Sequence, residues 1–370
     1  MNRKLKILMS GGGTGGHIFP AVAIADEIKK RFPDAEFLFI GAIGKMEMEK
    51  VPQAGYKIEG LNIAGFQRGN ILANFKLPFK AIASVLKAKN LVKNFKPDFA
   101  VGTGGFASGP ALYAAASLGI PTFLQEQNAH AGVTNKFLSK KAKAVFTAFP
   151  NVNGFPPEKI KFLGNPIRQN IANGLIDTKT AKEKLGLNPY KLTILSVGGS
   201  LGSRTLNNAW KENLEKVLEK DYQLIWQTGR LDYQNLLKET QAQTSNPDTG
   251  IHLKEFISDM ALAYSAADVI VSRAGAIAIS ELAVAQKPVL LVPFPFAAED
   301  HQTVNAMSLV EKNAARMVKD SEMKEKFWPT LMEITGSETL GKEMSENMKF
   351  FAKPNAAKEI VDEIIKAVQL

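Results

Sequence analysis

A histidine at the end of a glycine-rich segment is the first candidate for chemistry in this chain. Residues 6–25 read KILMSGGGTGGHIFPAVAIA, and five glycines in six positions come just before His17. Backbone without side chains lets an anion come close, and the start of a helix adds N–H groups and a positive dipole. A histidine with its ordinary pKa of about 6.5 can take a proton near neutral pH. We therefore expect an anion-binding loop in which His17 is the general base, or else only orients the loop or donates to a phosphate.

The elements that hold this loop are predicted by the pattern around it. Residues 7–9 form an apolar run typical of a buried strand, and Pro20 suits the first turn of a helix. Residues 191–210, KLTILSVGGSLGSRTLNNAW, repeat the order of strand, glycine turn and helix. Two such units, each opening its own half of the chain, predict an α/β protein with two doubly wound domains. Prolines crowd residues 149–166, where we expect the domain boundary.

Further polar candidates in the first half follow two of its predicted strands. The segment GTGGF makes a second glycine turn with Gly104 and Gly105, which either helps to cradle a diphosphate or lets a helix pack closely on a strand. Glu126 and Asn128 follow the strand predicted at residues 121–124, and open α/β sheets bind ligands at such carboxyl ends. Glu126 is therefore a second candidate for the base.

The second half offers a cation, a carboxylate and two amides. Arg168 in GNPIR could clamp a phosphate, although its spacing also fits a surface cation. The segment SRAGAIAISELA places a third glycine turn before a helix, and Glu281 in that helix could accept from two ribose hydroxyls or face solvent. Gln302 and Asn305 lie three residues apart on one predicted helix face, and neutral amides suit sugar hydroxyls.

Composition limits the class of protein. The 370 residues suggest two domains and include no cysteine, which excludes disulfides, zinc–thiolate sites and thiol catalysis. No apolar run is long enough to span a bilayer, and the amino terminus runs straight into the first predicted strand, which leaves no room for a signal peptide. These features predict a protein of the cytoplasm or of the cytoplasmic face of a membrane.

The positive charge is concentrated in the first half of the chain. Residues 1–166 carry a net charge of +12 and residues 167–370 one of −2. Residues 60–97 contain no acidic side chain, and their lysines interleave with apolar residues at helical spacing. This segment fits either an ordinary amphipathic helix with solvated lysines or a patch for an anionic lipid surface. The charge predicts an anionic partner, and nucleic acid, a membrane and a phosphorylated substrate all fit it.

Eight motifs occur in the order found in one family of enzymes. They are GGGTGGHIFPAVAIA, GTGGF, EQNAHAGVTNK, GNPIR, GGSLGSR, FISDM, SRAGAIAISE and EDHQTVNA. Over nearly its whole length the chain thereby resembles the MurG family of peptidoglycan N-acetylglucosaminyltransferases. The resemblance implies a GT-B fold of two facing Rossmann-like domains. Residues 1–166, with a C-terminal helix at about 352–370, would bind the acceptor and the membrane, and residues 167–351 would bind the UDP-sugar donor.

The resemblance also implies a reaction and its partners. Members of the family transfer N-acetylglucosamine from UDP-N-acetylglucosamine to the 4-hydroxyl of the muramoyl sugar of lipid I, with inversion, and so make lipid II for peptidoglycan. Because lipid I is linked through a diphosphate to undecaprenol, the expected partners are the two substrates and an anionic membrane surface. The implied location is peripheral, on the inner face of the plasma membrane. Nucleic acid is not expected as a partner. The chain contains no D-x-D pair, and no metal or other cofactor is expected.

The matching motifs imply site residues in both halves. In the first half, Thr14, Gly15 and Gly16 are expected in a loop near the sugar and the acceptor diphosphate, and Asn128 is expected to contact the donor sugar. The further candidates for the acceptor diphosphate are Gly13, Gly104 and Gly105.

In the second half, Arg168 and Ser200 are expected to flank the nucleotide diphosphate, and the backbone of Ile257 is expected to meet the uracil. Gln302 is expected to hold the N-acetylglucosamine hydroxyls, with Asn305 as its neighbour. The segment that lines the nucleotide, with its last residue on the ribose, is Ala276, Ile277, Ala278, Ile279, Ser280 and Glu281. Members of the family often have Leu-Thr where this chain has Ile277-Ala278, so one polar contact to the donor is in question.

Rival functions have requirements that the sequence meets poorly. A nicotinamide dehydrogenase needs a G-x-G-x-x-G fingerprint and an acid after the second strand, where Gly41 and Ala42 stand instead. An epimerase or another transferase of the same fold would share the glycine turns and differ in its use of an acceptor. A nucleic-acid binder needs aromatic stacking platforms in a recognised module, which the basic segment lacks.

Overall fold

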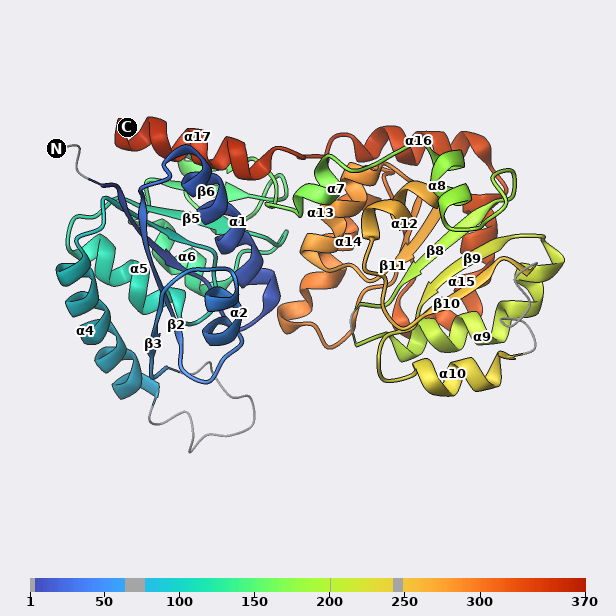
Figure 1. Cartoon of the computed structure of the whole chain (residues 1–370), viewed down its shortest axis with the longest axis horizontal. Helices are drawn as coiled ribbons and strands as arrows, with labels where there is room; N and C mark the ends of the chain where they lie inside the picture. The colour runs from blue at the N-terminus through green and yellow to red at the C-terminus, as the bar shows by residue number, and fades with distance from the viewer. Residues whose placement is uncertain (1–3, 64–76, 200, 242–248) are drawn as a thin grey trace. The chain divides into compact units, whose positions relative to one another are not determined.

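The computed structural model describes residues 4–63, 77–199, 201–241 and 249–370. The chain divides into two compact units: unit 1 comprises Met1–Ile167 and Asn355–Leu370, and unit 2 comprises Arg168–Pro354. Each unit contains one parallel sheet with helices packed on it (Figure 1).

Unit 1 is built on a seven-stranded parallel sheet in the order β3-β2-β1-β4-β5-β6-β7. Its strands are β1 (Lys6–Ser10), β2 (Glu36–Ala42), β3 (Ile58–Leu61), β4 (Phe99–Gly102), β5 (Thr122–Glu126), β6 (Ala144–Thr147) and β7 (Ile160–Phe162). Met9 of β1 is in register with Phe39 of β2 on one side and with Val101 of β4 on the other. The strand order reverses between β1 and β4, so the loops after these two strands meet at the point where such sheets bind ligands.

The helices of unit 1 include one from the far end of the chain. They are α1 (Gly15–Arg31), α2 (Glu47–Gln53), α4 (Leu77–Phe95), α5 (Ser108–Ser117), α6 (Val133–Ser139) and α17 (Ala356–Val368). The C-terminal α17 lies beside α1 (Figure 1). Ile360, Val361 and Ile364 of α17 are fully buried in the core of unit 1, and Arg31 of α1 donates a hydrogen bond to Asp362 at 2.5 Å. Helix α17 therefore completes the core of unit 1.

Unit 2 repeats this plan with a six-stranded parallel sheet in the order β10-β9-β8-β11-β12-β13. Its strands are β8 (Thr193–Val197), β9 (Gln223–Gln227), β10 (Ile251–Lys254), β11 (Val269–Ser272), β12 (Val289–Leu291) and β13 (Arg316–Met317). Its helices are α7 (Gln169–Ala172), α8 (Thr178–Lys184), α9 (Arg204–Glu219), α10 (Tyr233–Glu239), α12 (Met260–Ala266), α13 (Ala276–Ala285), α14 (His301–Val310), α15 (Met323–Thr335) and α16 (Glu338–Met348). The switch point lies between β8 and β11.

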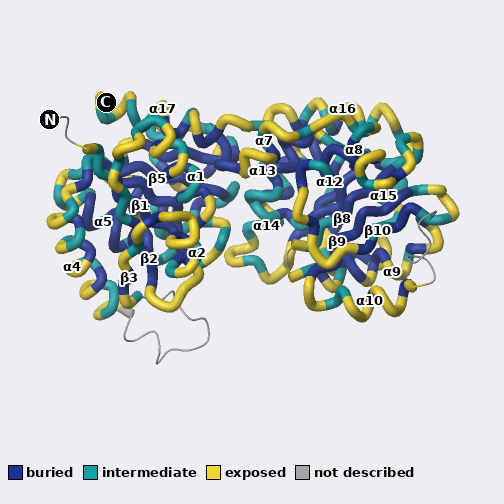
Figure 2. The backbone as a smooth tube through the Cα atoms, in the orientation of Figure 1, coloured by how far each residue is buried: buried dark blue, intermediate teal, exposed yellow. Residues whose placement is uncertain are grey.

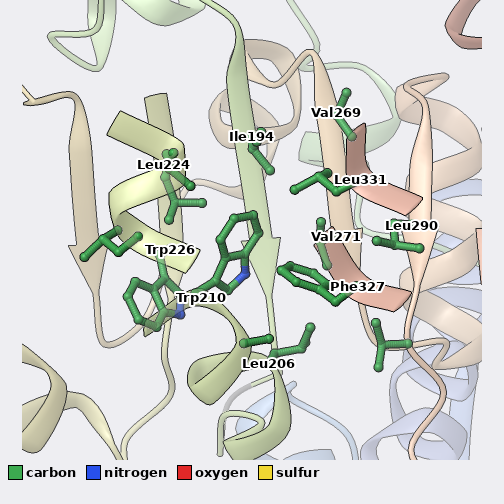
Figure 3. Packing of buried hydrophobic residues seen from close by; sticks show 14 of the residues in the cluster. Ile194, Leu206, Trp210, Leu224, Trp226, Val269, Val271, Leu290, Phe327 and Leu331 are labelled. Atoms are coloured by element: carbon green, nitrogen blue, oxygen red, sulfur yellow. The ribbon is translucent and has the colours of Figure 1, made fainter. Parts of the chain in front are cut away.

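The core of unit 2 is centred on large aromatic side chains. Figure 3 shows Trp210 of α9 and Phe327 of α15 side by side against the sheet. Their rings pack edge to face, with 5.0 Å between the ring centroids. The two buried indole N–H groups find acceptors, since Trp210 donates to Ser196 at 2.7 Å and Trp226 donates to Asn207 at 3.0 Å. Figure 2 shows that the central strands of both sheets, such as β4 and β11, are buried, which leaves the connecting loops to carry the candidate chemistry.

The predicted fold class is confirmed, since both halves of the chain form parallel α/β sheets. Glycine turns follow β1 and β8 and lead into α1 and α9, as the repeated pattern predicted. The strand expected at residues 121–124 runs further, to Glu126, because the apolar signal ends before the hydrogen-bonded ladder does.

Candidate active site

The glycine turn after β1 is hydrogen-bonded to a buried carboxylate. Glu47, at the start of α2, has no exposed surface and accepts from the N–H of Gly13 at 2.9 Å and from that of Ala42 at 3.0 Å. Gly13 has a φ of +88°, which a glycine adopts without strain. Gly13 was expected to contact the acceptor diphosphate, but its N–H is already engaged. The first-turn N–H groups of α1, at Gly15 and Gly16, have no acceptor within the helix. They are therefore better placed than the N–H of Gly13 to donate hydrogen bonds to an anion.

His17 sits in the first turn of α1, where the two glycine turns of unit 1 meet. Its Nδ1 lies 3.2 Å from the hydroxyl oxygen of Thr14, and its carbonyl accepts from the Thr103 hydroxyl at 2.7 Å. A Cβ added at Gly104 would come within 3.2 Å of the imidazole Nε2, and one at Gly105 within 2.2 Å of the Gly12 carbonyl. Both glycines have positive φ. Close approach of the two turns therefore requires glycine at both positions and fixes the imidazole beside the second turn.

Glu126 is a buried residue that organises the loop after β5. Its carboxylate accepts from the N–H of Asn128 at 3.1 Å, the N–H of Gly132 at 3.0 Å and the side-chain amide of Asn135 at 2.9 Å. These donors occupy most of its acceptor capacity, which favours a structural role over that of a base. Asn128 itself is only partly buried, as is His130 of the same loop.

In unit 2, Arg168 and Glu281 form a two-point ion pair. The guanidinium donates from Nε to Oε1 at 2.9 Å and from Nη2 to Oε2 at 3.1 Å, and the Tyr264 hydroxyl lies 3.3 Å from Oε2. The Arg168 side chain is 50% exposed, whereas that of Glu281 is 6% exposed. The hydrogen bond to Glu281 raises the pKa of Arg168, and burial raises the pKa of Tyr264. Arg168 is expected beside the diphosphate, and the structure adds that its guanidinium holds Glu281.

The start of α13 is positioned by two amides of α14. Gln302 accepts with Oε1 from the N–H of Ala274 at 3.1 Å and from that of Phe294 at 3.0 Å, so its Nε2 is the end that can donate to a sugar. Asn305 has no exposed surface and donates to the Ala274 carbonyl at 3.3 Å. In this conformation the buried Asn305 amide supports the loop before α13.

The segment expected to line the nucleotide forms the first two turns of α13. Gly275 is its N-cap, without a capping side chain, so first-turn N–H groups have no acceptor within the helix. Of the six expected residues, Ile279 and Glu281 are buried, and the side chain of Ile279 faces the core. The remaining four are partly exposed: Ala276, Ile277, Ala278 and Ser280.

The expected uracil and diphosphate loops are joined by a residue that the motifs did not single out. The N–H of Ile257 donates to Oε1 of Gln227 at 2.9 Å, and Nε2 of Gln227 donates to the Gly199 carbonyl at 3.1 Å. A backbone contact from Ile257 to uracil would therefore use its carbonyl oxygen. Ser200, the expected diphosphate ligand, lies outside the described residues.

A separate hollow of about 1460 Å³ in unit 2 lies next to Leu192, Asp268 and Pro288, at the amino ends of the strands. It shares no residue with the candidate site, which lies at the carboxyl ends. Over the described ranges, no three His, Asp or Glu side chains are grouped to hold a metal ion. Within the same ranges, every helix is too short or too polar to cross a membrane.

Comparison with known proteins matches both halves of the chain. The family model described as the N-terminal domain of glycosyltransferase family 28 matches residues 7–147, and the model of the C-terminal domain of that family matches residues 193–362. The first range contains His17 and Glu126, and the second contains Glu281 and Gln302. Arg168 falls between the two matched ranges.

Full-length relatives carry one name. Proteins of Parabacteroides distasonis (48% identity, 99% of both chains) and Phocaeicola vulgatus (50% identity, 99% of this chain and 97% of the relative) are named UDP-N-acetylglucosamine–N-acetylmuramyl-(pentapeptide) pyrophosphoryl-undecaprenol N-acetylglucosamine transferase. The crystal structure of Acinetobacter baumannii MurG is similar with a TM-score of 0.82 and 33% identity, over 98% of this chain and 100% of that one. The chain therefore belongs to glycosyltransferase family 28 and, within it, to the MurG family.

Proposed function

We propose that this chain transfers N-acetylglucosamine from UDP-N-acetylglucosamine to the 4-hydroxyl of the muramoyl sugar of lipid I and so forms lipid II. The observation that carries the proposal is the full-length similarity, at 48–50% identity, to relatives named for this transfer. In the reaction the acceptor oxygen bonds to the anomeric carbon as the bond from that carbon to UDP breaks. Attack from the face opposite the leaving group inverts the anomeric configuration.

The donor is assigned to unit 2. The carboxylate of Glu281, held by Arg168 and Tyr264, accepts from a ribose hydroxyl, and Nε2 of Gln302 donates to a hydroxyl of the sugar. The amino end of α13 supplies N–H groups and a positive dipole for the leaving diphosphate. With these donors in place the proposal includes no metal or other cofactor.

The acceptor is assigned to unit 1, with His17 as the general base. The 3.2 Å contact with the Thr14 hydroxyl suits an Nδ1–H tautomer, which puts the lone pair on Nε2. Nε2 then takes the proton of the attacking hydroxyl as the new glycosidic bond forms. Gly15 and Gly16, at the amino end of α1, are suited to the acceptor diphosphate.

Peripheral binding to an anionic membrane is assigned to α4 and α6. Phe79, Ile82 and Leu86 follow one face of α4 and are 69%, 62% and 58% exposed. Val133 and Phe137 of α6 are exposed as well, and α5 contacts both helices. Arg68 and Lys76 of the basic segment lie outside the described residues. An exposed apolar face with lysines around it supports a patch for an anionic lipid surface over an ordinary amphipathic helix with solvated lysines.

The reaction is tested by UDP release with a lipid I analogue present or absent. We expect release from UDP-N-acetylglucosamine that depends on the analogue. Donor consumption without the analogue would indicate an epimerase or hydrolase, and no consumption in either case would contradict the proposal.

The membrane face is tested by binding to anionic vesicles. Lys80 and Lys93 are suitable targets, whereas Lys87 is not, because its Nζ donates to the Gly60 carbonyl at 2.8 Å. Each lysine near such a surface is worth about 1 kcal/mol, so Lys80→Gln with Lys93→Gln should weaken binding roughly 30-fold. Leu86→Ser should also weaken binding, and Leu231→Ser, at a comparably exposed leucine of unit 2, should not. Equal binding by all variants would contradict this assignment.

A further inference from the structure

Gln227 is the last residue of β9 and bridges two loops of the candidate donor site. Its side chain is 3% exposed, donates from Nε2 to the Gly199 carbonyl at 3.1 Å and accepts with Oε1 from the N–H of Ile257 at 2.9 Å. In the sheet β9 lies between β8 and β10, so its end lies beside the turn after β8 and the loop after β10. One amide therefore sets the spacing between these two loops.

The residues that follow Gln227 contact the same two loops. The N–H of Thr228 donates to the Lys254 carbonyl at 2.9 Å, and that of Gly229 donates to the Glu255 carbonyl at 3.1 Å. A Cβ at Gly202 would come within 2.0 Å of the Thr228 carbonyl, so the turn after β8 lies directly against this segment. The Gln227 side chain thus acts within a tightly packed junction, where a small change in its length or polarity moves both loops.

The direction of the amide is fixed by its partners. The Gly199 carbonyl can only accept and the Ile257 N–H can only donate, so the residue between them must carry both a donor and an acceptor. An ionised carboxylate would place an acceptor against the Gly199 carbonyl, and an apolar side chain would leave both buried groups unpaired. Among residues of this length, glutamine satisfies both partners at neutral pH.

We propose that Gln227 is a positioning residue for the nucleotide: it holds the turn assigned to the diphosphate and the loop assigned to uracil at the separation that UDP requires. This inference rests on the proposed function, because that function places UDP on these two loops. Gln227 acts through Gly199 and Ile257 and does not itself contact the ligand.

The chain supplies a matched control on the same strand. Gln223, at the other end of β9, is also 3% exposed and also bridges backbone groups. It donates to the Asn188 carbonyl at 2.9 Å and accepts from the Asn188 N–H at 2.7 Å. Gln223 lies at the amino end of the strand, away from the candidate site. Its Nε2 also donates to the Thr193 hydroxyl at 2.9 Å. Gln227→Glu and Gln223→Glu therefore each place a carboxyl in a buried, hydrogen-bonded position of the same strand, and only the first is next to the proposed nucleotide loops.

The experiment measures UDP affinity by calorimetry between pH 5.5 and 8.5. At pH 8 we expect Gln227→Glu to bind UDP about tenfold or more weakly than the wild type, and Gln223→Glu to bind it normally. Burial raises the pKa of the introduced carboxyl, and its protonated form can again both donate and accept. UDP affinity of Gln227→Glu should therefore recover as the pH falls. A buried carboxylate also destabilises the fold more at high pH, and Gln223→Glu controls for that loss of stability.

A second variant guards against failure of the first to fold. Gln227→Met keeps the length but removes both polar atoms, so it should weaken UDP binding at every pH, while Gln223→Met should not. Equal UDP affinity of the Gln227 and Gln223 variants, or a Gln227→Glu affinity that follows the pH profile of the wild type, would overturn the inference. A wild type that binds no UDP would instead overturn the proposed function on which it rests.

Discussion

Replacing Glu281 by glutamine tests the proposed ribose contact most sharply. The carboxylate already accepts from two nitrogens of Arg168, at 2.9 and 3.1 Å, and lies 3.3 Å from the Tyr264 hydroxyl. Two carboxylate oxygens offer about four acceptor positions, so these partners leave room for about one more strong hydrogen bond. We expect a ribose hydroxyl to take that position.

The magnitude follows from the charge on the acceptor. A hydrogen bond to a charged group is worth about 1.5–3 kcal/mol, which corresponds to roughly 10- to 100-fold in the affinity for UDP-N-acetylglucosamine. The same substitution also disturbs the ion pair. Because the Arg168 side chain is half exposed and remains hydrated, that loss should lower the free energy of unfolding by only about 1 kcal/mol.

Donor analogues separate the two effects. Steady-state KM values for UDP-N-acetylglucosamine and for its 2′-deoxy and 3′-deoxy ribose analogues are compared in the wild type and in Glu281→Gln. In the wild type, KM should be about tenfold or more higher for at least one analogue than for UDP-N-acetylglucosamine. In Glu281→Gln, the analogues should raise KM little further. An equal penalty in both proteins would refute the ribose contact, because the missing hydroxyl would then not be bound by Glu281.

Three further predictions concern other parts of the molecule. His17→Ala should lower kcat by about 10²- to 10⁴-fold while UDP affinity, measured by calorimetry, stays unchanged, and a normal kcat would exclude the base role. Phe327→Ala should lower the free energy of unfolding in urea by about 3–5 kcal/mol, since it empties a fully buried site in the core. The hydrogen bond from Arg31 lowers the pKa of Asp362 below its ordinary value of 3.8, so this pair stabilises unit 1 above that pH and its effect is lost as the pH falls through the folded-state pKa. Asp362→Asn should therefore lower the free energy of unfolding by up to about 1 kcal/mol at pH 7 and leave it unchanged in strong acid. A decrease that does not vary with pH would contradict the assignment.

Much of the fold could be predicted because its signals are local. A short apolar run, a glycine turn and the start of a helix lie within twenty residues at both β1 and β8, and the same segments contain His17 and the turn proposed for the diphosphate. The rest depends on contacts between residues far apart in sequence. Glu47 supports Gly13 from 34 residues away, and Gln227 meets Ile257 across 30 residues. Such pairs have no fixed spacing in the sequence. The role of an acid such as Glu47 or an amide such as Gln227 therefore cannot be predicted from the sequence alone.

The same reason explains why two expected site residues have partners in the fold that the sequence did not predict. Asn305 has the residue type and spacing of a sugar ligand, but burial directs it to the Ala274 carbonyl. Arg168 has the fork that suits a phosphate, but Glu281, 113 residues later, is its partner in the fold. A residue's type therefore limits what it can bind, and the tertiary contacts decide which of those partners it meets.

The most direct test of the central claim is the structure of the reaction product. The wild type is incubated with UDP-N-acetylglucosamine and a lipid I analogue, and the product is examined by mass spectrometry and NMR. We predict an acceptor that has gained one N-acetylglucosamine, joined through a β linkage to the 4-hydroxyl of the muramoyl sugar. A retained α configuration, attachment at another hydroxyl, or an unmodified acceptor beside an altered donor would contradict the account.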